Sequence, residues 1–436
     1  MRKTKTRATA LVGTVLVGTL LAAACSSTGS GTSSPSTSPN AKTTVTVGLF
    51  GTFGYKEAGL FAEYMKLHPN IIITENSVEQ EQTYWQALQT HLAAGSGLDD
   101  VQGIEVGRIA DAVGPMASKW VNLNNYGAAS LQNTFFPWKW QAATTATGSV
   151  IGLGTDTGPE AICYRPDLFK QAGLPTDPAT LSTSWSTWQG YLAMGQEYEA
   201  HAPAKSAFMD SAAGLYNAIL GASPVQYYAK GGSVVYSTNP AVKNAWNLSM
   251  QAIAAHETAK LSQFSPGWNQ GFSTGAFATL ACPAWMLGYI QGQAGTAGSG
   301  KWNVATIPGG TGNWGGSYLG IPAAAQHKKE AYDLIAWLTA PAQQEQMWTK
   351  AGHFPSSSTA AQSPAVLNAT SSYFSNAPIG KIFSASAAKL PVQVAGPQAG
   401  TIGNLMANGI ALVEQQGKSP TQAWSTTMAN IANALG

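Results

Sequence analysis

Charged side chains are scarce in this 436-residue chain, since Asp, Glu, Lys and Arg make up only 10% of it, against about 25% in ordinary domains. Four of the cations, Arg2, Lys3, Lys5 and Arg7, lie in a leader that we expect to be removed. The formal net charge therefore falls from +2 to +2 − 4 = −2. This balance gives no reason to expect a nucleic acid or an anionic surface as a partner. Fourteen Trp and fifteen Tyr in so weakly charged a chain favour a neutral ligand.

Sequence signatures of common catalytic and metal sites are also absent. The six His are scattered without the spacing of metal ligands, and neither HExxH nor GxSxG occurs. The stretch GTAGSGKW (295–302) has the glycines and lysine of a phosphate loop, but Trp302 replaces the required Ser or Thr. We therefore predict no metal, no cofactor and no enzymatic activity. A secreted glycoside hydrolase remains an alternative, because two carboxylates across a cleft leave no sequence motif.

The N-terminal segment lacks an apolar run long enough for a comfortable membrane span of roughly 20 residues. MRKTKTR followed by ATALVGTVLVGTLLAAA is typical of an export signal, so residues 1–24 are predicted to be a signal peptide. LLAAAC resembles a lipobox, although Leu21 lies four residues before Cys25 instead of three. We expect a lipid on Cys25; ordinary secretion with cleavage elsewhere is the alternative. Residues 25–43, rich in Ser, Thr, Gly and Pro, are predicted to be a flexible tether.

Only two cysteines follow Cys25, namely Cys163 and Cys282. In an oxidising compartment such a lone pair often forms a disulfide, and the long loop that it closes would restrict the unfolded chain. Two buried free thiols are the alternative.

Hydrophobic periodicity predicts an open α/β sheet in the first part of the chain. Residues 43–50, 70–77 and 99–105 have the pattern of strands, and 56–69 and 82–95 that of the intervening helices. In such sheets, ligands lie outside the carboxyl ends of the strands. Residues 152–175 have the pattern of a strand, a crossing turn, a second strand and a short helix. Further helices are expected over much of 160–310, including one that Trp185 and Trp188 open, at 239–256 and 327–341, and after Ser419 and Pro420. About 390 folded residues exceed the usual size of one core, so two lobes are expected.

Several spaced motifs resemble the group 1 extracellular solute-binding proteins, the carbohydrate receptors of ABC importers. They are strongest at 307–357 and in GKSPTQAW (417–424), and cover most of the chain after the leader. Within that family, TDTGPEAICYRPDLFKQAGLP (155–175), CPAWMLGYI (282–290) and GNWGGSYL (312–319) are most similar to lipoprotein receptors for cellobiose and longer cello-oligosaccharides.

The resemblance implies a monomer with a two-lobed periplasmic-binding-protein-like (type II) α/β fold. Its N-terminal lobe is expected at 44–155 plus 312–356, and its C-terminal lobe at 156–311 plus 357–436. A neutral oligosaccharide would bind between the lobes, which close on it by bending at the crossing segments. Permease subunits in the membrane would then take up the cargo. Xylo-oligosaccharides, β-mannosides and α-linked disaccharides remain alternative ligands.

The stretch GGTGNWGGSYLGIP (309–322) is the strongest candidate for sugar contact. Trp314 is predicted to stack on a sugar face and Asn313 to bond a hydroxyl, while Gly315 and Gly316 allow close approach. A solvent loop or a structural turn with a buried Trp is the alternative.

Further candidates come from exposed-looking loops and from the ends of the predicted strands. The aromatic candidates are Trp285, Trp268 and Phe53, whereas the remaining named tryptophans, Trp185, Trp188, Trp246, Trp337 and Trp348, have the pattern of core residues. The polar candidates, which would accept or donate hydroxyl hydrogen bonds, are Asp156, Glu105, Glu79, Gln80 and Asp210.

Overall fold

Two β-sheets organise residues 42–436, the part of the chain that the computed structural model describes. The predicted signal peptide, Cys25 and residues 25–41 of the predicted tether lie outside the described residues. Thr43, the last residue of the predicted tether, is already the first residue of a strand. No helix within 42–436 is both long and apolar enough to cross a membrane.

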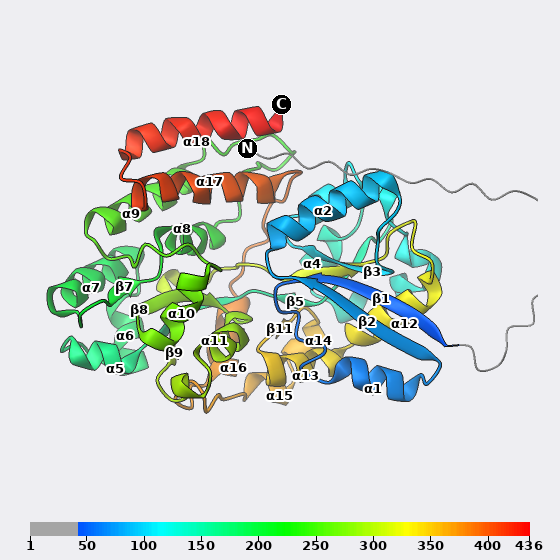
Figure 1. Cartoon of the computed structure of the whole chain (residues 1–436), viewed down its shortest axis with the longest axis horizontal. Helices are drawn as coiled ribbons and strands as arrows, with labels where there is room; N and C mark the ends of the chain where they lie inside the picture. Colours follow the sequence, from blue (N-terminus) through cyan, green and yellow to red (C-terminus); the bar gives the residue numbers. More distant parts are fainter. Residues whose placement is uncertain (1–41) are drawn as a thin grey trace, which may run out of the picture. The chain divides into compact units, whose positions relative to one another are not determined.

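The first sheet has the strand order β2-β1-β3-β10-β4 (Figure 1). β1 pairs in parallel with β2 and β3, whereas β10 is antiparallel to both β3 and β4. The strands are β1 (Thr43–Phe50), β2 (Ile71–Val78), β3 (Val101–Glu105), β4 (Gly152–Gly154) and β10 (Ser317–Gly320). A segment from late in the chain thus completes the early sheet.

Alternating and helical apolar patterns account for this first lobe. In β1, Val45, Val47 and Leu49 are buried, and in α1 the residues Leu60 and Phe61 pack into the same core. The helices of this lobe are α1 (Leu60–Leu67), α2 (Glu81–Ala94), α3 (Ile109–Val113), α4 (Pro137–Ala142), α12 (Lys328–Leu338) and, at its border, α13 (Pro341–Ala351). Short 3₁₀ helices lie at Ala117–Lys119, Leu123–Tyr126 and Ala128–Thr134.

The second sheet has the order β7-β8-β6-β9. β6 is antiparallel to β8 and β9, and β7 is parallel to β8. The strands are β6 (Glu160–Tyr164), β7 (Ala207–Met209), β8 (Phe277–Pro283) and β9 (Asn303–Ala305). A disulfide between Cys163 and Cys282 joins β6 to β8, as expected. β6 and the following α5 (Pro166–Gln171) confirm the strand and short helix predicted within 152–175. For the rest of 160–310 the prediction emphasised helices and did not identify β7, β8 and β9, which are short and mostly buried instead of alternating.

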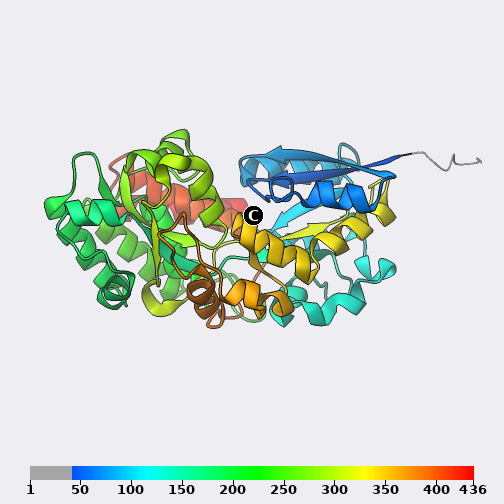
Figure 2. The same cartoon turned by 90° about the horizontal axis from the view of Figure 1, so that it is seen from below.

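Helices surround the second sheet, and the last two helices of the chain pack against this lobe (Figures 1 and 2). The helices of this lobe are α5 (Pro166–Gln171), α6 (Pro178–Ser184), α7 (Trp188–His201), α8 (Ala212–Gly221), α9 (Pro240–Ala254), α10 (Pro266–Thr274), α11 (Met286–Ala294), α14 (Ser358–Ala361), α15 (Pro364–Leu367), α16 (Ile379–Ala387), α17 (Ala399–Glu414) and α18 (Pro420–Leu435). Two 3₁₀ turns lie at Thr296–Gly298 and Pro308–Gly310.

Two details of the helix predictions differ in outcome. Ser419 caps α18 by accepting the N–H of Gln422, with Pro420 at the first helical position, as predicted. The prediction that Trp185 opens a helix is wrong, because Trp185 is the residue that ends α6, and only Trp188 begins α7. The Trp185 indole is fully buried and donates to the carbonyl of Thr306.

Three segments cross between the lobes side by side. The first contains β5 (Asp156–Thr157), which pairs with β11 (Phe354–Pro355) of the third. The second, residues 312–316, pairs with the residues after β5: Glu160 N–H donates to Gly312 O, and Trp314 N–H donates to Gly158 O. These paired crossings connect the two lobes.

A buried carboxyl group lies beside the crossings. Glu160 is 0% exposed, and neither of its carboxylate oxygens has a hydrogen-bond partner among residues 42–436. Burial raises its pKa to about 8, so the neutral acid is the favoured form at neutral pH.

Candidate ligand-binding site

Three partly exposed aromatic rings lie together: Trp285, which immediately precedes α11, Trp314 in the second crossing, and Phe264, which precedes α10. The rings of Trp285 and Trp314 are 5.4 Å apart at 72°, and the indole N–H of Trp285 donates to the carbonyl of Trp314 at 2.9 Å. Phe264 lies 6.3 Å from Trp285 and 6.2 Å from Trp314. We call these three rings the aromatic face.

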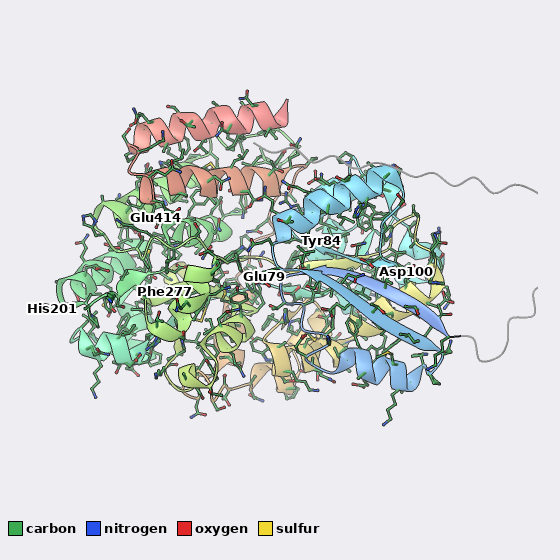
Figure 3. All side chains as sticks on the ribbon, in the orientation of Figure 1. Glu79, Tyr84, Asp100, His201, Phe277 and Glu414 are labelled. Carbon is green, nitrogen blue, oxygen red and sulfur yellow. A yellow bond between two sulfur atoms is a disulfide. The ribbon has the colours of Figure 1, made fainter. Side chains whose placement is uncertain are left out.

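The first lobe meets this region through the end of β2. Gln80 donates its side-chain amide to the carbonyl of Phe264 at 3.1 Å, and the hydroxyl of Tyr289 lies 3.4 Å from Glu79 Oε1. In Figure 3 the label of Glu79 lies where the ribbons of the two lobes meet. Glu79 and Gln80 are exposed, and both contact the second lobe.

Phe53 and Glu105 lie at the ends of neighbouring strands, as predicted from their positions in the sequence. Phe53 is half-buried, packs edge-on against Phe50 at 5.1 Å and lies close to Gly103 of β3. Glu105 accepts the N–H of Gly107 at 2.5 Å. Burial, together with the nearby charge of Glu81, raises the pKa of Glu105 to about 7. This carboxyl is therefore only partly charged at neutral pH.

Trp268 does not have the exposed position that the sequence suggested. It lies inside α10, is 0% exposed, and donates its indole N–H to Asp210 at 2.8 Å. Asp210 is itself buried and accepts a second hydrogen bond from Gln263 at 2.9 Å. Burial raises the pKa of Asp210 to about 6. The two residues form an internal hydrogen-bonded pair next to Phe264, and their contact with ligand stays a prediction.

Asp156 is likewise used within the protein. One carboxylate oxygen accepts from the N–H of Ser317 and the hydroxyl of Thr155, and the other lies 3.5 Å from His353 Nδ1. Burial alone would raise the pKa of Asp156, but the hydrogen bond and charge of His353 hold it below its ordinary value. Asp156 therefore ties the first crossing to the start of β10 and to His353 beside the third crossing, and its hydrogen bonds to sugar hydroxyls stay a prediction.

The glycines around Trp314 also serve internal packing. A Cβ on Gly315 (φ +88°) would lie 2.9 Å from the indole nitrogen of Trp285, and one on Gly316 (φ +96°) 2.8 Å from the carbonyl of Asp156. The side chain of Asn313 is mostly buried, and its carbonyl accepts the N–H of Gly158. These glycines admit the Trp285 indole and the neighbouring crossing, and the close approach of ligand at Gly315 and Gly316 stays a prediction.

A second contact between the lobes involves the start of α17. The N–H of Gln398, which precedes α17, donates to Asp111 of α3 at 2.9 Å, and Gly400 N–H donates to Gly107 O at 3.2 Å. The Arg108 guanidinium packs so tightly on Gly400 that a Cβ there would lie 2.8 Å from it. Two hydrogen bonds to Glu81, at 3.0 and 3.1 Å, hold Arg108 in place. The lobes therefore touch both at the end of β2 and at the start of α17.

A small cavity, of about 110 Å³, lies beside this second contact. Its walls come from the β3–α3 turn and α4 of the first lobe, and from residues 226–228 and 390–395 of the second. Gln393 crosses it, donating to Gly221 O at 2.8 Å and accepting from the Asn313 amide at 3.3 Å. The cavity is smaller than the ~300 Å³ at which sites for drug-sized ligands begin, and none of the lining residues within 42–436 is charged.

Phe264, Gln393 and Asp111 were not identified from the sequence. Phe264 stands next to Ser265 and Pro266, a helix-start signal that could have drawn attention to the preceding aromatic residue. Nothing local marks Gln393 or Asp111, because their partners are 80 and 287 residues away along the chain.

Comparison with known proteins identifies the family. The model of the bacterial extracellular solute-binding protein family matches residues 59–378. A crystal structure described as an extracellular solute-binding protein of family 1 is 40% identical, with a TM-score of 0.77, and the match covers 90% of this chain and 100% of that one. A search of curated proteins gave no match.

Two solved structures with lower identity share the fold. One is the ABC-transporter-associated binding protein of Bifidobacterium animalis subsp. lactis Bl-04 in complex with beta-1,6-galactobiose (19% identity, TM-score 0.77, 91% of this chain and 98% of that one). The other is the galacto-N-biose/lacto-N-biose I-binding protein of Bifidobacterium longum in complex with lacto-N-biose (19% identity, TM-score 0.73, 92% of this chain and 98% of that one). They confirm the predicted periplasmic-binding-protein-like α/β fold.

Members of this family are receptors and not catalysts, which confirms the prediction that the chain is not an enzyme and removes the glycoside hydrolase alternative. The family match over residues 59–378 and the 40% identity over nearly the whole described chain lead to one conclusion. This chain belongs to the family 1 bacterial extracellular solute-binding proteins.

Proposed function

We propose that this protein is the substrate-binding component of an ABC sugar importer and captures a neutral oligosaccharide between its lobes. Our best candidate ligands are cellobiose and longer cello-oligosaccharides; xylo-, manno- and α-linked saccharides are the alternatives. The observation that carries the proposal is the aromatic face of Phe264, Trp285 and Trp314, which lies against the end of β2 from the other lobe.

The chemistry of the surroundings supports an uncharged saccharide. A pyranose ring has flat C–H faces that suit indole rings and a rim of hydroxyls that needs hydrogen bonds. The aromatic face supplies the rings, and Glu79, Gln80 and Asn269 supply polar groups nearby. The raised pKa of Glu105, about 7, weakens the charge that this carboxyl presents at neutral pH. The two fold relatives solved with saccharides agree with this ligand class.

Ligand that touches both lobes binds the closed arrangement better and shifts the population toward it. We propose lobe boundaries at 44–155 plus 312–356 and at 156–311 plus 357–436, so that bending falls at the three crossings. We further propose that the protein acts as a monomer and is anchored to the outer face of the cell membrane by a lipid on Cys25. Residues 25–41, together with Lys42 before β1, would form its tether. Membrane permease subunits would recognise the closed form.

Calorimetric titration with cellobiose, cellotriose, xylobiose, mannobiose and maltose tests this proposal. We expect saturable binding of at least one of them, with a shift in tryptophan fluorescence and no release of monosaccharide. The matched pair Trp285→Ala and Trp337→Ala locates the site: the first change should reduce affinity, whereas Trp337 packs against Tyr64 in the first-lobe core and its loss should mainly reduce stability. Binding that is unchanged in Trp285→Ala would rule out the aromatic face as the site.

A further inference from the structure

The backbone of Phe264 is in an unfavourable conformation. Its φ is +64°, in the left-handed region that a bulky aromatic residue rarely adopts. The next residue, Ser265, caps α10 by accepting the N–H of Trp268. Strained residues of this kind persist where the surrounding structure holds them, and they concentrate at binding sites.

The ring of Phe264 is central to the aromatic cluster. It is within 6.3 Å of four other rings: Trp268 at 5.1 Å, Tyr289 at 5.7 Å, Trp314 at 6.2 Å and Trp285 at 6.3 Å. Its plane is within 19° of that of Trp285, so these two partly exposed rings are nearly parallel. Phe264 therefore limits the space over Trp285 and Trp314.

The same residue is where the first lobe makes contact. Gln80, the residue before α2, donates to the carbonyl of Phe264, whose backbone carries the strain. The neighbouring contact between Tyr289 and Glu79 comes from the same two chain segments. Opening the lobes would break the Gln80 bond and remove one restraint on the Phe264 backbone. The position of the ring is thereby coupled to closure.

We propose that Phe264 is a ligand-contacting residue that determines specificity, and that Gln80 fixes its ring over Trp285 and Trp314 only when the lobes are closed. It would select saccharides with a flat, unsubstituted C–H face, because a substituent projecting from that face would collide with the third ring. The specificity part of this inference rests on the proposed sugar-binding function. The coupling between Gln80 and the aromatic face depends only on the hydrogen bond to Phe264 and on the ring contacts of Phe264.

Labelling with 5-fluorotryptophan and ¹⁹F NMR tests the coupling without any ligand. Trp285→Phe and Trp314→Phe assign the two resonances among the 14 tryptophans. We expect Gln80→Ala to shift or broaden both resonances, although no hydrogen bond joins Gln80 to either indole among the described residues. Gln86→Ala, an exposed change on the same helix α2, is the matched control and should leave both unchanged. Unaltered resonances in Gln80→Ala would overturn the coupling.

Affinity measurements with the saccharide panel test the specificity. Relative to wild type, we expect Phe264→Ala to bind cellobiose at least 10-fold more weakly and to lose discrimination between cellobiose and mannobiose, whose axial 2-hydroxyl projects from the ring face, with Phe264→Leu intermediate. Phe272→Leu, which alters a buried ring of the same cluster, should change the melting temperature but not affinity. Wild-type affinity and discrimination in Phe264→Ala would refute the specificity role. If wild type binds no saccharide of the panel, the proposed function fails, and the NMR result alone decides whether Phe264 is coupled to closure.

Discussion

Asp111→Ala should open the protein in the absence of ligand. Asp111 of the first lobe is 5% exposed and accepts the N–H of Gln398 at the start of α17, a helix of the second lobe. A hydrogen bond to a charged group contributes about 1.5–3 kcal/mol, and a negative charge at a helix N-terminus adds to it. If this bond exists only in the closed arrangement, a loss of about 2 kcal/mol lowers the closed-to-open ratio by a factor of roughly 30.

The assay is the distance between the lobes, measured by pulsed electron paramagnetic resonance with spin labels at Thr90→Cys on α2 and Gln251→Cys on α9, both exposed positions. We expect a broader distribution with longer distances in Asp111→Ala and a weaker saccharide affinity, by up to roughly 30-fold. Asp111→Asn retains an acceptor oxygen and should fall between Asp111→Ala and wild type.

Asp177→Ala is the matched control, because Asp177 accepts the N–H of Thr180 at the start of α6 entirely within the second lobe. It should lower the melting temperature without changing the distance between the labels. If Asp111→Ala behaves like Asp177→Ala, the contact at α17 persists in open and closed forms alike, and the reasoning that assigns it to closure is refuted.

Three further changes have expected outcomes. Trp314→Ala should weaken saccharide binding by about 1 kcal/mol or more, from the loss of aromatic contact, and unchanged affinity in calorimetry would remove Trp314 from the site. Replacing both Cys163 and Cys282 by Ser should lower the free energy of unfolding in urea by about 2–5 kcal/mol, because the bridge closes a loop with a sequence separation of 119; an unchanged unfolding curve would contradict the disulfide's contribution. Glu160→Gln should lessen the loss of stability on raising pH. The pKa of Glu160 in the folded state, about 8, lies above the ordinary 4.5, so the wild-type free energy of unfolding decreases as the pH rises from 4.5 to 8, by at most roughly 5 kcal/mol. Glu197→Gln is the control and should keep this pH dependence. If the free energy of unfolding of Glu160→Gln follows that of wild type and the control from pH 5 to 9, the pKa of Glu160 is not raised in the folded state.

Local sequence patterns predicted the early sheet well, because its signals lie within short windows. Alternation marks β1, apolar spacing marks α1, and the Ser-Pro pair marks the start of α18. The antiparallel addition of β10 to that sheet depends on pairing with β3 more than 200 residues earlier, which no local pattern carries.

The candidate site was harder to predict, because residue type does not show whether a side chain is already satisfied inside the protein. Trp268 and Asp156 have the chemistry of sugar contacts, yet one is fully buried and the other is bonded to Ser317 and His353. Phe264 was missed for the opposite reason. Its proposed role depends on its positive φ and on the hydrogen bond that its carbonyl accepts from Gln80, 184 residues away along the chain. No local sequence pattern predicts either feature.

Titration of the purified protein with cellobiose, followed by calorimetry and by the ¹⁹F resonances of Trp285 and Trp314 together, tests the central claim most directly. The account predicts saturable binding that moves both resonances and shortens the distance between the lobe labels. Saturable binding that leaves both indole resonances in place would contradict it, since the sugar would then occupy some other surface of the molecule.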